Sequence, residues 1–137
     1  MYNRGFATLV HPSRIFRPED WLRFIHGAAF ERKWGKLKLN DDDLRALEIA
    51  IMLGPRRPPV VPGTGGMRKI RYGDEKAGRG KSGAFRIYYA YLRDYGIVLL
   101  ATAFGKNEAD DLTDAGKAVM ASLIREIESQ LESGLIR

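Results

Sequence analysis

Basic side chains are concentrated in the middle third of this 137-residue chain, between Arg56 and Arg93. This segment contains ten lysines and arginines against two acidic residues, a net charge of +8, whereas residues 1–55 carry +2 and residues 94–137 carry −4. Aromatic residues interleave with the basic ones in FRIYYAY (85–91). Clustered cations with interleaved aromatics are typical of a surface that binds a polyanion, and RNA or DNA is the first candidate.

Alternation along two predicted strands, MRKIRY (67–72) and AFRIYYAYL (84–92), groups several of these side chains. The pairs that share a face are Lys69 with Arg71 on the first strand and Arg86 with Tyr88 on the second. If the two faces correspond, the four side chains form one patch, which Lys106 joins after the next strand. Each cation alone is more simply read as solvated surface or as protection of a sheet edge. Their concentration favours a surface that follows a phosphate backbone and stacks bases on tyrosines.

Such a patch has the chemistry to cleave RNA. RNA carries its own nucleophile, the 2′-hydroxyl, so an enzyme needs to orient it, move two protons and stabilise the developing negative charge. Lysine and arginine can supply the last effect without a metal, and a lysine or tyrosine can transfer protons. The candidate catalytic residues are Lys69, Arg71, Arg86, Tyr88 and Lys106. The candidate RNA-binding residues are Arg68, Lys76, Arg79 and Lys81.

Other site chemistries fit the sequence poorly. A phosphate-binding loop of the form GxxxxGK[ST] would need a glycine where Glu75 stands, and GTGG (63–66) is better read as a tight turn that starts a strand. The chain has no cysteine and only two histidines, His11 and His26, so we expect no metal site and no cofactor. The three aspartates at 41–43 are interpreted as favourable charges at a helix start rather than as a magnesium site.

The elements that would position the patch follow in a simple order. We expect a strand at 21–26, a short helix at 28–39 interrupted near Gly35, a helix from Asn40 to Gly54, strands at 67–72, 84–92 and 97–104, a turn or hairpin loop at 73–83, and a last helix from Thr113 to Gly134. The strand IVLLATAF (97–104) is apolar on both faces, as a central strand would be. This order predicts an α+β fold: a small antiparallel-rich β-sheet packed by an N-terminal helix pair and a C-terminal helix.

The chain divides into residues 1–20, predicted to be an extension of uncertain structure, and one domain over residues 21–137. The longest apolar run is too short for a membrane helix, and the N-terminus lacks the pattern of a signal peptide. We therefore expect a cytoplasmic protein that does not contact a membrane.

Three segments together resemble a known family: PGTGGMRKIRY (62–72), GRGKSGAFRIYYAYL (78–92) and IVLLATAFGKNEADDLT (97–113). They are similar to toxins of the RelE/ParE superfamily from type II toxin–antitoxin systems of bacteria, in particular the RelE-type branch often called HigB-like. The resemblance extends from about Leu22 to Leu131.

This resemblance implies a RelE-like fold and a metal-independent endoribonuclease, an mRNA interferase, which cleaves mRNA on translating ribosomes and so inhibits translation. It also implies a partner antitoxin with a helix-turn-helix DNA-binding domain. Lys69, Arg71, Arg86 and Lys106 match basic positions of the family. Asn107 and, approximately, Thr113 stand where some members have an arginine and a tyrosine, so either Tyr88 or Lys69 remains a candidate for proton transfer.

Two other functions are compatible with the sequence. One is a related ParE-like toxin that inhibits a protein target such as DNA gyrase, against which the retained strand lysines and arginines count. The other is an RNA-binding module without catalysis, which would show salt-dependent RNA affinity and no cleavage.

Overall fold

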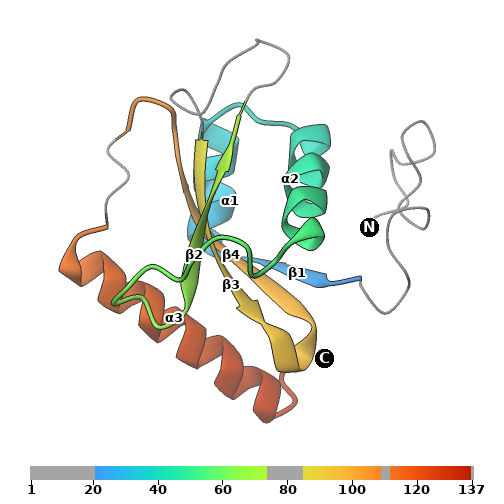
Figure 1. Cartoon of the computed structure of the whole chain (residues 1–137). Coiled ribbons are helices and arrows are strands. Elements are labelled where there is room, and N and C mark those ends of the chain that lie inside the picture. The colour runs from blue at the N-terminus through green and yellow to red at the C-terminus, as the bar shows by residue number, and fades with distance from the viewer. Residues whose placement is uncertain (1–20, 74–84, 109–111, 137) are drawn as a thin grey trace.

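A four-stranded mixed sheet forms the centre of the protein (Figure 1). The computed structural model describes residues 21–73, 85–108 and 112–136, so the predicted extension 1–20 and most of the predicted loop 73–83 lie outside it. The elements are β1 (Arg23–His26), α1 (Ala28–Lys36), α2 (Asp41–Leu53), β2 (Met67–Tyr72), β3 (Phe85–Leu92), a 3-10 turn (Arg93–Tyr95), β4 (Ile97–Phe104) and α3 (Asp114–Glu132).

The strands lie in the order β1-β4-β3-β2. The pair β1–β4 is parallel, whereas β2–β3 and β3–β4 are antiparallel. The predicted α+β class and the antiparallel-rich sheet are therefore confirmed. Several boundaries differ by a few residues from expectation: for example, the first strand begins at Arg23, and the first helix ends at Lys36, shortly before Lys38 takes a left-handed φ of 60°.

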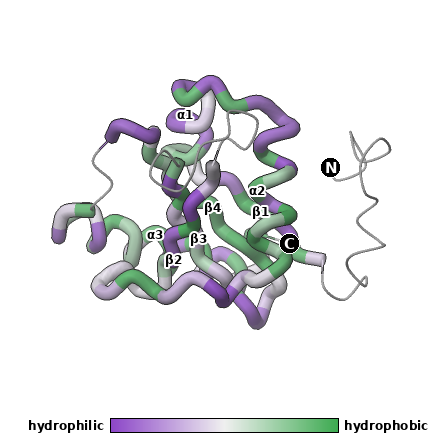
Figure 2. The backbone as a smooth tube through the Cα atoms, turned by 45° about the horizontal axis from the view of Figure 1, so that its top comes forward, coloured by the Kyte–Doolittle hydropathy of each residue, from purple (hydrophilic) through white to green (hydrophobic). Residues whose placement is uncertain are grey.

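Helices cover both faces of the sheet, and each face has its own hydrophobic cluster (Figure 1). On one face, side chains of α1 and α2 such as Trp34 and Leu47 pack with Leu100. On the other face, Met120 of α3 packs with Leu99. β4 is buried along nearly its whole length, and its hydrophobic course through the centre is visible in Figure 2. The prediction of a central strand at 97–104 is thus confirmed.

The start of α2 explains the run of aspartates. The Asn40 side chain accepts a hydrogen bond from the Asp43 backbone N–H at 2.9 Å, and the Asp43 carboxylate accepts one from the Asn40 N–H at 3.0 Å. This reciprocal capping box satisfies two backbone donors of the first turn. Asp42 pairs with Arg45, and Tyr72 donates to Asp43. Asp42 and Asp43 thus have partners within the protein, in agreement with the helix-start interpretation.

A glycine-rich turn before β2 sets where that strand begins. The buried Thr64 hydroxyl donates to the Val61 carbonyl at 2.6 Å and accepts from the Met67 N–H at 3.0 Å. Gly65 has a φ of 74°, and a Cβ there would lie 3.1 Å from the Ala121 Cβ on α3. A side chain would be both strained and obstructed at this position. The GTGG segment (63–66) therefore forms a tight turn that starts β2, as expected, and it positions this strand against α3.

None of the helices in the described parts of the chain has the length and apolar character that crossing a lipid bilayer requires.

Replacing Thr64 with Val should destabilise the fold by about 1–3 kcal/mol, because the buried Met67 N–H loses its acceptor while the volume is kept. Thr64→Ser is the matched control, since it keeps the hydroxyl and loses one methyl group, worth about 0.8 kcal/mol. Urea denaturation measures both variants. A Val variant at least as stable as the Ser variant would contradict this role of the hydroxyl.

Candidate nucleic-acid interface

The β2–β3 register places four of the predicted catalytic residues on one face of the sheet. Lys69 lies directly opposite Tyr88, and Arg71 lies directly opposite Arg86. Side chains of directly opposed residues in an antiparallel pair project to the same side. The expectation that the two strand faces correspond is confirmed, and we refer to these four residues as the strand cluster.

The strand cluster sets two arginines against each other. Like charges directly opposite in a sheet are destabilising, so each guanidinium needs another partner or solvent. Arg71 is exposed to solvent, whereas Arg86 is only 6% exposed. The Arg86 guanidinium donates to the backbone carbonyl of Lys106 at 3.2 Å and to that of Glu108. Arg86 therefore ties the turn that follows β4 to the sheet.

Exposure divides the strand cluster into two layers. Tyr88 is 2% exposed, and its ring meets the Phe104 ring edge-on at 5.8 Å between centroids. Lys69 is half-buried and Arg71 is exposed. The two cations of β2 are therefore the members that a bound polyanion could reach directly, while Tyr88 and Arg86 lie beneath the surface.

Lys106 follows β4 and is connected to the cluster mainly through its backbone. Its carbonyl accepts from Arg86, but its Nζ lies 5.0 Å from the centre of the Phe85 ring. Phe85 belongs to the hydrophobic cluster on the α1–α2 face. The structure thus places Lys106 at the same end of the sheet as the strand cluster, with its ammonium group over an aromatic ring rather than beside Lys69 and Arg71.

Arg68, predicted to bind RNA, braces a loop in this structure. Its guanidinium donates to the carbonyls of Arg56 at 3.1 Å and Pro58 at 2.5 Å. Nearby, the Tyr89 hydroxyl donates to the Pro55 carbonyl at 2.8 Å, and burial raises the pKa of Tyr89 to about 12. Both side chains hold the segment after α2 against the sheet. The other predicted RNA-binding residues, Lys76, Arg79 and Lys81, lie outside the described residues.

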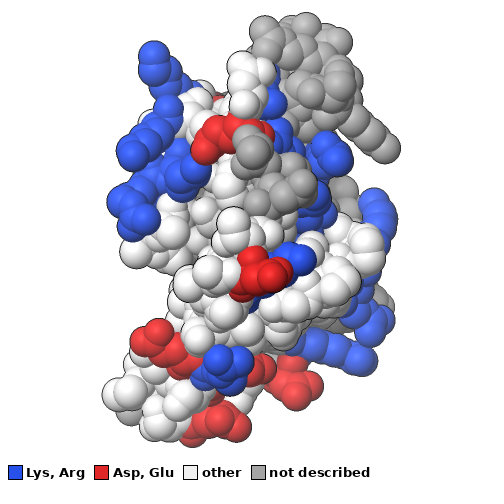
Figure 3. All heavy atoms as spheres, turned by 90° about the vertical axis from the view of Figure 1, so that its left-hand side faces the viewer, with Lys and Arg blue, Asp and Glu red and all other residues white. Residues whose placement is uncertain are grey.

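Helix α1 carries two exposed basic residues that the sequence analysis did not select. Arg32 and Lys36 are exposed one helical turn apart. Figure 3 shows basic side chains at the upper left and along the right side of the view, and most acidic side chains at the lower end. The four-residue spacing of the two cations was a signal available in the sequence, but the helix was interpreted only through its apolar stripe.

Glu108 is another residue that the sequence analysis did not select. Its carboxylate accepts from the Lys33 Nζ and from the Gly105 N–H, both at 2.7 Å. The Lys33 hydrogen bond, followed by that of Gly105, holds the pKa of Glu108 below its ordinary value of 4.5. Because Lys33 and Glu108 are 75 residues apart in the chain, no local spacing could have identified the pair.

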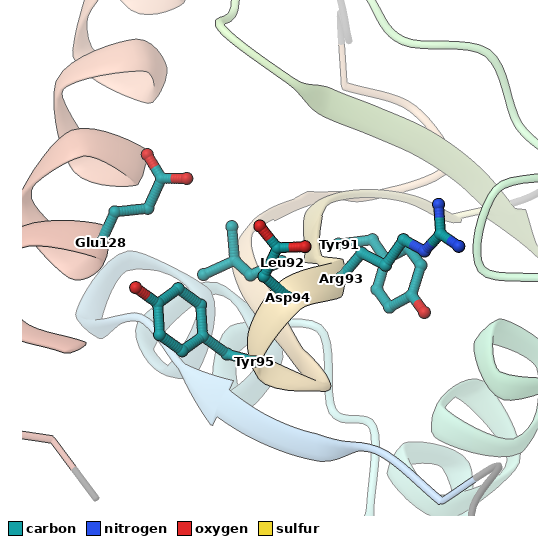
Figure 4. A pocket seen from close by; sticks show the side chains of 6 residues that line it. All are labelled: Tyr91, Leu92, Arg93, Asp94, Tyr95 and Glu128. Atoms are coloured by element: carbon teal, nitrogen blue, oxygen red, sulfur yellow. The ribbon is translucent and has the colours of Figure 1, made fainter. Parts of the chain in front are cut away.

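In the described ranges, no group of three or more His, Cys, Asp or Glu residues could hold a metal ion. A surface pocket of about 140 Å³ lies at the other end of β3 and is shown in Figure 4. It is lined by Tyr91, Leu92, Arg93, Asp94, Tyr95 and Glu128. None of the predicted site residues contributes to this pocket.

No family model matches the chain. Among solved structures, a mutant of the E. coli toxin RelE in its free state is similar, at 21% sequence identity and a TM-score of 0.44. The match covers 72% of this chain and 93% of that chain.

Replacing Lys33 with Met should raise the pKa of Glu108 toward 4.5, because the strongest interaction favouring the carboxylate is removed while the Gly105 N–H remains. Because folding lowers the pKa of Glu108, its carboxylate stabilises the protein at pH values above the pKa of the unfolded state. This contribution is lost as the pH falls through the pKa of the folded state. NMR titration of the Glu108 carboxyl carbon in the wild type and the variant gives the shift. Lys36→Met on the same helix is the control, and an equal shift in both variants would contradict the pairing.

Proposed function

We propose that the protein is the toxin of a type II toxin–antitoxin module, of the HigB-like RelE branch, and acts as a metal-independent endoribonuclease on mRNA in translating ribosomes. The observation that carries this proposal is the strand cluster, in which Arg71 opposes Arg86 and Lys69 opposes Tyr88 on one face. The order of the three family-like segments in the sequence supports the same assignment. A helix-turn-helix antitoxin would be its partner.

The charge arrangement favours an anionic ligand over a purely structural role. Placing Arg71 opposite Arg86 costs stability. The hydrogen bonds of Arg86 go to backbone carbonyls, which are uncharged, so these contacts do not neutralise the charge of Arg71. A phosphate bound above Lys69 and Arg71, the two cations that β2 contributes to the strand cluster, would be attracted by both. Its negative charge would reduce the repulsion among the positive charges of the strand cluster. RNA offers such phosphates at regular spacing.

In the proposed reaction, Lys69 and Arg71 hold the scissile phosphate and stabilise the charge that develops on its oxygens. The 2′-oxygen of the RNA attacks the adjacent phosphorus and the P–O5′ bond breaks, which leaves a 2′,3′-cyclic phosphate. The 2′-hydroxyl gives up its proton, and the departing 5′-oxygen takes one up to become a hydroxyl. Lys69 and Tyr88 remain the two candidates for proton transfer. Their exposures favour Lys69, since Tyr88 is 2% exposed beneath the surface.

Replacing Lys69 or Arg71 with Ala should lower the rate of mRNA cleavage about 100-fold, the usual effect of removing one group that stabilises transition-state charge. Primer extension on a reporter mRNA in a reconstituted translation reaction measures the rate. The same variants should relieve the growth arrest caused by induced expression of the wild type.

Arg93→Ala is the matched control, because it removes an equivalent charge from the exposed far end of the same sheet. It should cleave at the wild-type rate. If Arg93→Ala and Arg71→Ala lose activity equally, or if both β2 variants stay folded and fully active, the site assignment is wrong.

An RNA-binding module without catalysis is the second candidate, and the burial of Tyr88 and Arg86 favours it. In this case Lys69 and Arg71 would contact phosphates only. RNA affinity would then fall with salt, and each Ala variant would reduce the slope of log affinity against log salt by about one. No new RNA ends would be found with the wild type, which distinguishes the two functions.

A further inference from the structure

We propose that Glu108 is a positioning residue of the RNA-cleaving face: together with Lys33 and Arg86 it fixes the turn 105–108, and thereby Lys106, at the end of the sheet. The role in cleavage rests on the proposed function, whereas the fixing of the turn rests on contacts within the protein.

Glu108 gathers contacts from three parts of the chain. Its side chain accepts from the Gly105 N–H at 2.7 Å, and its own N–H donates to the Gly105 carbonyl at 3.2 Å, so the turn is closed from both sides. The Lys33 ammonium binds the second carboxylate oxygen from α1. Arg86 of β3 donates to the Glu108 carbonyl. A helix, a strand and the turn itself therefore meet at one residue.

The turn has little space to adopt another path. A Cβ on Gly105 would lie 2.9 Å from the Leu37 side chain and 3.3 Å from the Glu108 carboxylate. Contacts below 3.0 Å require a neighbour to move, so glycine allows the turn to pass between these two side chains. The backbone of Lys106 is held between this constriction and the Arg86 hydrogen bond.

The ion pair also adjoins the strand cluster. The Lys33 Nζ lies 4.9 Å from the centre of the Phe104 ring, and that ring packs edge-on against Tyr88. Lys33 thus contacts both the turn that carries Lys106 and an aromatic neighbour of the cluster. The Glu108 side chain is 44% exposed, and exposed ion pairs contribute little to global stability. Loss of Glu108 should therefore change the local geometry more than the stability of the whole fold.

The test compares Glu108→Ala with Glu108→Gln, which keeps an oxygen to accept from Gly105. With programmed ribosomes as substrate, Glu108→Ala should lower kcat about tenfold and change KM by less than about twofold, because the turn is linked to the strand cluster through Arg86 and through Lys33 and Phe104, and a disturbed cluster acts on the transition state. Glu108→Gln should retain most of the activity. Lys33→Met should lose an intermediate amount, and combining it with Glu108→Ala should cost no more than Glu108→Ala alone.

A second readout needs no RNA. Hydrogen exchange at the Gly105 amide, followed by NMR, should be slow in the wild type and in Glu108→Gln and at least tenfold faster in Glu108→Ala. Glu128→Ala, which removes an exposed carboxylate from α3, is the control for both readouts and should behave as the wild type.

The two proposals fail in different ways. If the wild-type protein produces no new RNA ends, the proposed nuclease function is wrong. Hydrogen exchange at the Gly105 amide would still show whether Glu108 fixes the turn. Unchanged exchange and unchanged kcat in Glu108→Ala overturn the positioning role, as would a change in KM alone or an equal loss in Glu128→Ala. If Glu108→Ala does not fold, kcat and exchange in Glu108→Gln and Lys33→Met decide in its place.

Discussion

The antiparallel pairing of β2 with β3 is the constraint on which the candidate site depends. Side chains alternate along β2 and β3, so a slip of one residue in their pairing would send Lys69 and Arg71 to the α1–α2 face and Ile70 to the α3 face. The register is held at one end by the Thr64 turn, which fixes where β2 begins against α3. Packing therefore determines the arrangement of charge. The hydrophobic clusters on the two faces of the sheet fix the register, and the register keeps Lys69 and Arg71 together on the α3 face.

Arg86 joins the turn after β4 to the strand cluster. A buried guanidinium needs acceptors, and the carbonyls of the turn after β4 supply them. The same hydrogen bonds place Lys106 and Glu108 beside the start of β3. Removing Arg86 would thus disturb the turn as well as the charge, so Lys69 and Arg71 are the better positions at which to test the proposed RNA cleavage.

The sequence predicted the fold well because its signals are local. Alternation defined β2, the apolar run defined β4, and Asn40 with Asp43 marked the start of α2. The shared face of Lys69 and Arg86 also followed from alternation, once the strands were assumed to pair. The contacts of Glu108 and the burial of Tyr88 could not be predicted, since both arise from segments that meet only in three dimensions. The direction of the Lys106 ammonium group depends on the turn and not on strand periodicity, which is why it lies over Phe85 instead of joining the cluster.

The parallel pairing of β1 with β4 has a consequence for the synthesis of the chain. The β2–β3 pair can form from neighbouring sequence, but β1 must wait for β4, and Lys33 must wait for a partner 75 residues later. Long-range pairings of this kind form slowly because much of the chain must be ordered first. A nascent chain on the ribosome would therefore carry its basic strands well before the turn at 105–108 exists, and the complete site would assemble only when the last third of the protein has emerged.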